Sequence, residues 1–266
     1  MKRVRFRSVV FLCLFIIPLS VGAYLLSYWP EVERLAKTNP KTTALIEGRR
    51  TAKGKQEPLV SLAARWRSLR QISPHLQRAV VVAEDARFYQ HQGFDWEAIV
   101  EAAERDWAAR SFEYGGSTIS QQLVKNLYLS SEKSPIRKIK EALITSVMEA
   151  KLKKRRILEV YLNVVEWGGG IYGAEAAADH YFSKPAAELA PQEAAFLAAI
   201  LPAPRYYQNR RSTPYLRKRI DSILQAMQKR YPETRMAMEK EIPKEEKIEN
   251  SEGLEEVGTA TTPQTP

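Results

Sequence analysis

Two short segments of this 266-residue chain carry side chains suited to acid–base chemistry and to the stabilisation of negative charge. In the first, the apolar run 79–83 leads directly into Glu84. Desolvation at such a position can raise the pKa of a carboxyl group, as a general acid or base requires. In the second, Arg137 and Lys138 flank Glu141 at helical spacing, which suits phosphate binding. Simpler explanations are a charged helix end for the first and an i,i+4 ion pair for the second.

Residues 117–129, between these segments, predict an amphipathic helix whose polar face carries hydroxyl, amide and amine groups. The polar face consists of Thr118, Gln121, Gln122, Lys125 and Asn126. These groups suit hydrogen bonding to a sugar or a phosphate, and the Gly-Gly-Ser-Thr sequence at 115–118 would supply free backbone N–H groups at the helix N-terminus. The spacing alone fits an ordinary surface helix equally well.

The chain is basic, with 41 Lys and Arg residues, 31 Asp and Glu residues and a net charge of +10. Its composition of 44% hydrophobic and 27% charged residues is typical of a globular protein and excludes a collagen-like fibre or a polytopic membrane protein. The single cysteine, Cys13, excludes a disulfide scaffold or a cysteine-based metal cluster. Five cations occur in 151–156, a run that forms either a solvated face or a contact with anionic lipid headgroups.

The first 30 residues predict a single transmembrane anchor. Residues 1–8 contain four cations and no acid, and residues 9–28 contain no charge, which matches the roughly 20 residues that cross a bilayer. The positive-inside rule then places the N-terminus in the cytoplasm and the rest outside. A cleavable signal peptide is the alternative, with 21–23 as its cleavage site, but the apolar run continues past it. An extracytoplasmic body would not meet nucleic acid.

Composition divides the remaining chain into three parts. Residues 31–57 are mostly polar and predict a linker, 58–232 form a mainly α-helical body, and 233–266 predict an acidic, disordered tail. The long helices expected in the body are 96–110, 117–129, 135–163, 175–180, 191–201 and 214–229.

Four motifs occur in order and together resemble the peptidoglycan glycosyltransferase family in its short monofunctional form. They are EDARFYQHQGFD at 84–95, GGSTISQQLVKN at 115–126, RKIKE at 137–141 and KRRILEVYLN at 154–163. Residues 169–182 and 191–201 resemble the last shared segments of the family.

The resemblance implies a mainly helical, lysozyme-like domain that polymerises lipid II into β-1,4 glycan strands, with inversion and release of undecaprenyl pyrophosphate. It implies that Glu84 is the general base and that Glu141 is a second catalytic carboxylate. It is compatible with a divalent cation, Mg²⁺ or Mn²⁺, bound by Glu141. The substrate-binding residues that it implies are Ser117, Thr118, Gln122, Lys125, Asn126, Arg137, Lys138 and Lys154.

The same resemblance implies a location in the bacterial inner membrane with the catalytic domain on the periplasmic side. The expected partners are lipid II, the nascent glycan strand, the membrane, and cell-division or wall-synthesis proteins. Two alternatives are a lysozyme-like lytic enzyme that cuts peptidoglycan and a non-catalytic, membrane-tethered scaffold for wall precursors.

Overall fold

The computed structural model describes residues 30–52, 62–109, 116–130, 132 and 134–234, together with residues 15, 16, 19, 20 and 22. Most of the predicted anchor at 9–28 and nearly all of the predicted acidic tail therefore lie outside the described residues. A search of the described residues finds no helix with the length and apolar character needed to cross a membrane.

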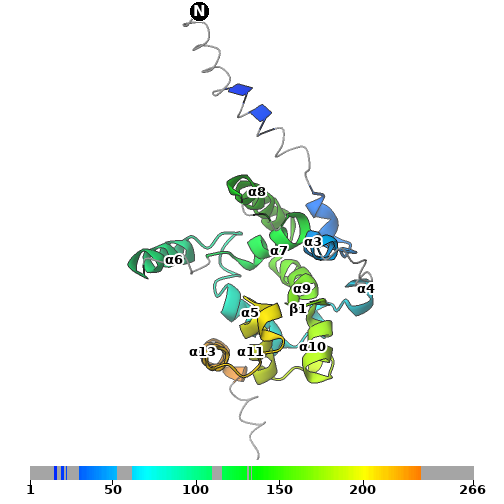
Figure 1. The fold of residues 1–266 in the computed structure, drawn as a ribbon, viewed down its shortest axis with the longest axis vertical. Coiled ribbons are helices and arrows are strands. Elements are labelled where there is room, and N and C mark those ends of the chain that lie inside the picture. The colour runs from blue at the N-terminus through cyan, green and yellow to red at the C-terminus, as the bar shows by residue number, and fades with distance from the viewer. Residues whose placement is uncertain are drawn as a thin grey trace, which may run out of the picture.

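The described chain is mainly helical, which confirms the mainly α-helical part of the predicted fold class (Figure 1). Its α-helices are α3 (Ala44–Ala52), α4 (Leu62–Arg65), α5 (Pro74–Glu84), α6 (Trp96–Ala109), α7 (Ile119–Tyr128), α8 (Pro135–Lys151), α9 (Lys154–Val164), α10 (Ala174–Phe182), α11 (Pro191–Ile200), α12 (Pro204–Tyr207) and α13 (Pro214–Arg230). The 3₁₀ helices are η2 (Val32–Ala36), η3 (Leu69–Gln71) and η4 (Ala186–Glu188). The strands β1 (Glu166–Gly168) and β2 (Ile171–Tyr172) form an antiparallel hairpin.

The observed helices differ from the predicted ones at two places that bear on the candidate site. The single helix expected over 135–163 is two helices, because Leu152 and Lys153 adopt extended backbone angles between α8 and α9 and Leu152 is buried. The apolar run before Glu84 belongs to a helix, α5, that the sequence analysis did not predict. Ser73 caps this helix by accepting a hydrogen bond from the His75 N–H at 3.2 Å, and Pro74 occupies its first position.

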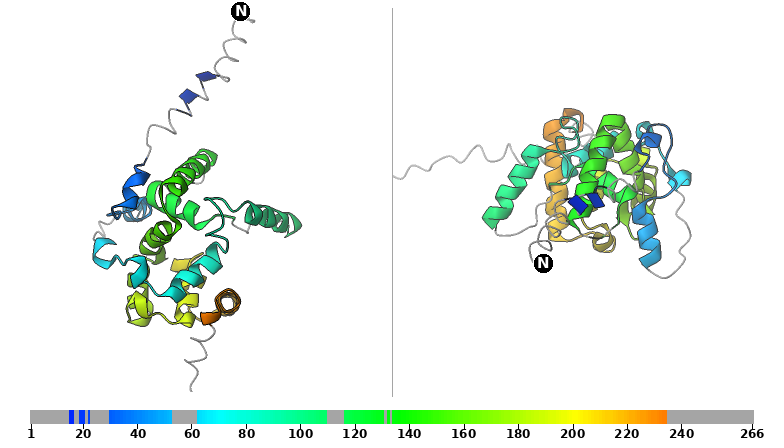
Figure 2. Two further views of the ribbon diagram at one scale, coloured as in Figure 1. Left: turned by 180° about the vertical axis from the view of Figure 1, so that it is seen from behind. Right: turned by 90° about the horizontal axis from the view of Figure 1, so that it is seen from above.

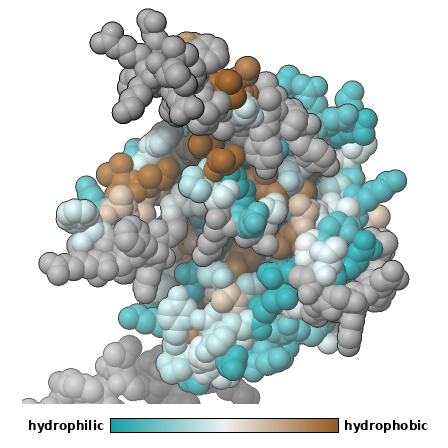
Figure 3. Space-filling view, turned by 45° about the horizontal axis from the view of Figure 1, so that its top comes forward, coloured by the Kyte–Doolittle hydropathy of each residue, from teal (hydrophilic) through white to brown (hydrophobic). Residues whose placement is uncertain are grey.

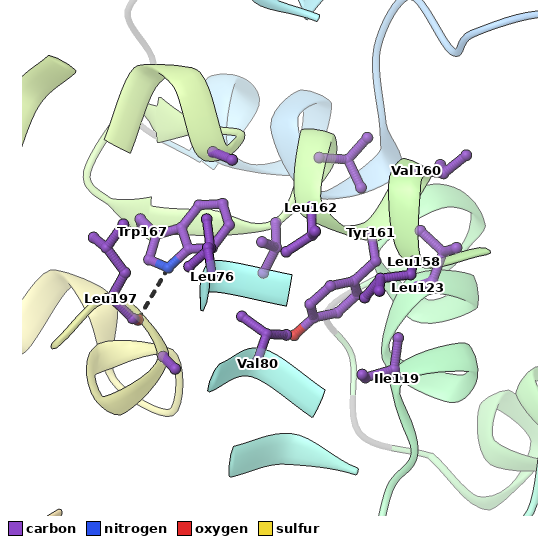
Figure 4. Close-up of a cluster of buried hydrophobic side chains, with 14 of the residues drawn as sticks. Leu76, Val80, Ile119, Leu123, Leu158, Val160, Tyr161, Leu162, Trp167 and Leu197 are labelled. Atoms are coloured by element: carbon purple, nitrogen blue, oxygen red, sulfur yellow. Dashed lines mark hydrogen bonds between the residues drawn. The ribbon is translucent and has the colours of Figure 1, made fainter. Parts of the chain in front are cut away.

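The hydrophobic core lies where α5, α9 and α11 pack together with α7 and α13 (Figure 4). Trp167 is fully buried, and its indole Nε1–H donates a hydrogen bond to the Leu197 carbonyl oxygen at 3.0 Å. Tyr161 of α9 is also fully buried, and its ring lies beside Ile119 and Leu123 of α7. This core fixes the C-terminal end of α5 against α7.

Much of the segment predicted as a linker is packed against the body. Val32, Leu35 and Ile46 are buried in the main core, η2 contacts α8, and α3 contacts α7. The Arg156 Nε–H donates to the Leu35 carbonyl oxygen at 2.7 Å. A few apolar side chains in a polar segment are enough to dock it, and composition does not reveal this.

The helices that carry the candidate site residues pack in two sets. α7 packs against α8 and α9, and α13 packs against α5 and α11. The helix α6 projects away from these packed helices in two opposite views (Figures 1 and 2).

Candidate active site

The end of α5 is joined to the start of α7 by a buried carboxylate. Asp85 follows the last residue of α5, and its Oδ2 accepts a hydrogen bond from the Ile119 backbone N–H at 3.0 Å. Its Oδ1 lies 2.9 Å from His91 Nε2. Burial raises the pKa of Asp85, and the hydrogen bond and charge of His91 oppose that rise. Asp85 thus fixes Glu84, its neighbour in sequence, relative to α7.

Each oxygen of the Glu84 carboxylate has a hydrogen-bond donor from a different helix. Gln122 Nε2 donates to Oε2 at 2.9 Å, and Arg219 Nη2 of α13 donates to Oε1 at 3.4 Å. The orientation of the Gln122 amide is fixed in turn, because its Oε1 accepts from the Tyr161 O–H at 3.0 Å. The Glu84 side chain is 11% exposed, so a substrate hydroxyl can still reach it.

The environment of Glu84 suits a general base. Burial raises its pKa above the ordinary range for glutamate, while the Gln122 hydrogen bond and the charges of Arg219 and Lys125 partly oppose the rise. A base with a raised pKa accepts a proton from a hydroxyl more readily than an ordinary carboxylate does.

The environment of Glu141 is quite different. Its side chain is only 3% exposed and both of its oxygens contact cations. Arg137 Nη1 donates to Oε2 at 2.8 Å, and Lys138 Nζ donates to Oε1. Lys138 Nζ also lies 3.4 Å from Ser117 Oγ, which joins this cluster to the residues that precede α7. The structure therefore brings together the predicted site residues of α8 and Ser117.

Lys125 of α7 connects the two carboxylates electrostatically. The pKa of its ammonium group is lowered, first by burial among neighbouring protein atoms and then by the charges of Arg137 and Lys138. The charges of Glu141 and Glu84 oppose this decrease. Contacts from the same segment join the two sides, since Gln122 donates to Glu84 and Ser117 lies 3.4 Å from the Lys138 Nζ that contacts Glu141.

Several polar residues of the predicted polar face make structural contacts within the protein. Thr118 is 2% exposed and is the N-cap of α7, where its hydroxyl donates to the Gly93 carbonyl oxygen at 2.7 Å. Gln121 completes the capping box with Thr118. Asn126 is 8% exposed and lies on the buried side of α7. These three polar residues belong to the helix start and the interior.

Lys154, another predicted binding residue, lies in a different ion pair. Its Nζ is 2.7 Å from Glu149 Oε1 and 4.5 Å from the centre of the Phe88 ring. Glu149 also accepts a hydrogen bond from the Ser120 hydroxyl. These contacts connect α9 with α8, α7 and the segment after α5, so Lys154 supports the residues around the base.

Two side chains that contact the Glu84–Gln122 pair were not predicted from the sequence. Tyr161 lies within the fourth motif, but nothing in that motif indicates that its hydroxyl reaches Gln122. Arg219 lies 135 residues after Glu84. On α13 it is one of several basic residues, so no local pattern distinguishes it from its neighbours.

The residues around Glu141 do not fit a divalent cation in this arrangement. A magnesium or manganese site needs several oxygen ligands, whereas each Glu141 oxygen already contacts a positively charged nitrogen. Asp85, His91 and Asp95 offer three potential ligand atoms within 4.8 Å of one another. Those carboxylates already accept hydrogen bonds from backbone N–H groups and, at Asp95, from Arg87. No catalytic step is therefore assigned to a metal.

A helical domain with a desolvated base on one side and a cation cluster on the other is the arrangement expected of a group-transfer enzyme with an anionic leaving group. The family model described as transglycosylase matches residues 55–228. The chain therefore belongs to the transglycosylase family, a class of glycosyltransferase, which confirms the family predicted from the ordered motifs.

The names of similar proteins agree with the family match. The chain is 52% identical over 186 residues to the biosynthetic peptidoglycan transglycosylase of Nitrosomonas eutropha, covering 70% of this chain and 76% of the relative. It is 48% identical over 189 residues to the protein of that name from Nitrosospira multiformis, covering 71% of this chain and 82% of the relative. The corresponding protein of Laribacter hongkongensis is 49% identical over 189 residues, covering 71% and 83% of the two chains.

Proposed function

We propose that this chain polymerises lipid II into β-1,4 glycan strands through a lysozyme-like glycosyltransferase domain. One observation carries the proposal: residues 117–122 contact both sides of the site, because Gln122 donates to the desolvated Glu84 at 2.9 Å and Ser117 lies 3.4 Å from the Lys138 Nζ that contacts Glu141. The site therefore has a proton acceptor at one side and positive charge at the other. Transfer of a sugar from a pyrophosphate donor requires both.

In the proposed reaction, Glu84 accepts the proton of the 4-hydroxyl group of the acceptor N-acetylglucosamine. That oxygen attacks the anomeric carbon of the donor, and the bond between this carbon and the pyrophosphate oxygen breaks. The anomeric centre inverts, and undecaprenyl pyrophosphate leaves with the electron pair. Lys125, Arg137 and Lys138 stabilise the charge that develops on the leaving group.

Glu141 has a supporting role in this mechanism. It contacts Arg137 and Lys138 at once, which holds two long, flexible side chains in one place before the substrate binds. Positioned cations need no reorganisation as charge develops, so they stabilise a transition state more effectively than mobile ones do. Glu141 is therefore a positioning residue that acts by holding the leaving-group cations.

We also propose that the domain works at the periplasmic face of the inner membrane behind the predicted N-terminal anchor. Large apolar side chains are exposed on α6, at Trp96, Val100 and Trp107, and others are exposed on α8. Figure 3 shows apolar residues in the upper part of one face, while its lower part is mainly hydrophilic. Exposed apolar groups of this kind support contact with a bilayer that contains the lipid-linked substrate and the growing glycan.

A lytic enzyme and a precursor-binding scaffold fit the site less well. Hydrolysis of finished glycan produces no anionic leaving group, so it has no use for the cations around Glu141. A scaffold has no use for a buried carboxylate whose pKa is raised, because burying that charge costs stability.

The decisive experiment incubates the full-length chain, in detergent or in vesicles, with labelled lipid II. We expect glycan strands to grow and undecaprenyl pyrophosphate to be released, and we expect pre-made glycan to remain intact. Shortening of pre-made glycan would support the lytic alternative. Binding of lipid II without polymerisation by the wild-type protein would support the scaffold.

A further inference from the structure

The C-terminal helix α13 provides a charged contact to the candidate base. Arg219 lies in the second turn of α13, and its Nη2 is 3.4 Å from Glu84 Oε1. The Arg219 side chain is 26% exposed, and α13 packs directly against α5. The contact therefore joins two helices that are far apart in the sequence. It is made at Oε1, the carboxylate oxygen that Gln122 does not bind.

We propose that Arg219 is a positioning residue for the general base, holding the Glu84 carboxylate through Oε1 while Gln122 holds it through Oε2. This inference rests on the proposed function, because Glu84 needs a defined orientation only if it accepts a proton from the substrate. Two donors from two helices fix the rotation of the carboxylate plane, which a single donor would leave free.

The charged and titratable groups that face Glu84 explain why a cation is needed there. They are Asp85 from the same segment, Lys125 and the neutral Gln122 from α7, Tyr161 from α9 and Arg219 from α13. Burial and Asp85 favour the protonated form of Glu84, which cannot act as a base. Arg219 and Lys125 provide the opposing positive charge. The charge of Lys125 is shared with Glu141 and its cations. Arg219, in contrast, forms an ion pair with Glu84 itself.

The hydrogen bonding of Arg219 is unusual for an arginine that only stabilises the fold. Its Nε is buried and has no hydrogen-bond partner among the described residues. Leaving a buried donor unpaired destabilises the folded protein. Arg137, the guanidinium that contacts Glu141, has a buried and unpartnered Nε of the same kind. Each arginine therefore contacts its glutamate through one terminal nitrogen while its Nε–H group stays without a hydrogen-bond partner among the described residues.

The test compares Arg219→Gln, Arg219→Lys and the matched control Arg217→Gln in the full-length chain. Arg217 lies on the same helix, is exposed, and donates to the Ser212 carbonyl oxygen at 3.1 Å. Lipid II polymerisation is measured from pH 5 to pH 9, and thermal unfolding is followed for each variant. The Glu84 carboxyl group is titrated by NMR in protein with ¹³C-labelled glutamate side chains, with its signal identified by its loss in Glu84→Gln.

For Arg219→Gln we expect kcat to fall about tenfold near neutral pH with little change in KM, since the base is misplaced and less ionised. The acid limb of the pH–rate profile and the NMR titration of Glu84 should both move to higher pH. Arg219→Lys, which keeps the charge, should recover part of kcat and much of the pH profile. Arg217→Gln should behave like wild type.

The proposal is overturned if Arg219→Gln leaves the titration of Glu84 unchanged, or if kcat falls only in proportion to lost folded protein. A rise in KM at constant kcat would also overturn it, because that would make Arg219 a substrate-binding residue. If wild-type protein fails to polymerise lipid II, the proposed function fails. The NMR titration still measures the effect of Arg219 on Glu84 in that case.

Discussion

Glu84 and Glu141 are both buried glutamates, with side chains 11% and 3% exposed, but their partners differ completely. Glu84 receives a neutral amide at 2.9 Å and a guanidinium at 3.4 Å. Glu141 receives a guanidinium at 2.8 Å and an ammonium group. Burial alone therefore does not decide what a carboxylate does in this site.

The difference in partners separates two roles. The Glu84 carboxylate keeps a raised pKa and pairs with one cation rather than two, so it can take a proton from a substrate hydroxyl. Glu141 neutralises and holds two cations, so that they face the leaving group in a fixed arrangement. Enzymes commonly assign different roles to two carboxyl groups through their environments. Each prediction below perturbs one side of this comparison.

The largest effect is expected from Glu84→Gln, which keeps the shape of the side chain but removes the base. We expect kcat for lipid II polymerisation to fall about 10²–10⁴-fold, the range for a general base, with lipid II binding preserved. Activity assays and a direct binding measurement test this together. Glu188→Gln, at an exposed position, is the matched control. Polymerisation within a few-fold of wild type would show that another group is the base.

A large effect is also expected on the other side of the site from Arg137→Gln. Loss of one charge-stabilising group costs about 10²-fold in kcat, because the developing pyrophosphate charge loses a partner. Unlike Glu84→Gln, this variant should leave the acid limb of the pH–rate profile in place. Arg70→Gln, at an exposed position on η3, is the control for the loss of a positive charge. A shift of the acid limb comparable to that of Arg219→Gln would contradict the assignment of Arg137 to the leaving group rather than to the base.

A smaller effect is expected from Tyr161→Phe. The buried hydroxyl donates to Gln122 Oε1 at 3.0 Å, and its loss frees the Gln122 amide to rotate away from Glu84. One neutral hydrogen bond is worth about 1 kcal/mol, so we expect kcat to fall about fivefold. Polymerisation kinetics measure this, with Tyr128→Phe, on the neighbouring helix α7, as the control. An unchanged kcat would show that Gln122 keeps its orientation without Tyr161.

The same comparison shows what the sequence can and cannot predict. Arg137, Lys138 and Glu141 lie within one helical turn and a half, so their spacing alone places them together. The environment of Glu84 depends on contacts between distant elements, with Arg219 from α13 and Tyr161 from α9. Local periodicity carries no information about such contacts, and only the family resemblance identified Glu84 as the base.

The polar face predicted for 117–129 illustrates a second limit. Gln122 contacts Glu84, whereas Thr118 and Gln121 cap the helix and Asn126 is buried. Hydroxyl and amide side chains serve helix caps and ligand sites equally well, so residue type does not separate the two uses. The fold class was easier to predict, since long amphipathic stretches form helices whichever partner they pack against.

The smallest predicted effect concerns the stability of the fold rather than its activity. Burial raises the pKa of Glu84 in the folded protein above the ordinary glutamate value. Above that raised pKa the folded chain must hold a charge that the unfolded chain solvates better, so ionised Glu84 lowers stability. Glu84→Gln should therefore stabilise the protein at pH 7 by about 1 kcal/mol, a typical gain when a functional residue is removed.

This stability gain should depend on pH in a defined direction. As the pH falls through the folded-state pKa and then the ordinary glutamate value, wild-type Glu84 becomes protonated in both states, and its disadvantage relative to glutamine disappears. Thermal unfolding of wild type, Glu84→Gln and Glu188→Gln at pH 7 and pH 4 measures the trend. A Tm gain for Glu84→Gln that is the same at both pH values, or a loss at pH 7, would mean that Arg219 and Gln122 fully compensate the buried charge. Glu84 would then resemble Glu141, a carboxylate held by its partners, and the contrast between the two glutamates would have to lie in their access to substrate.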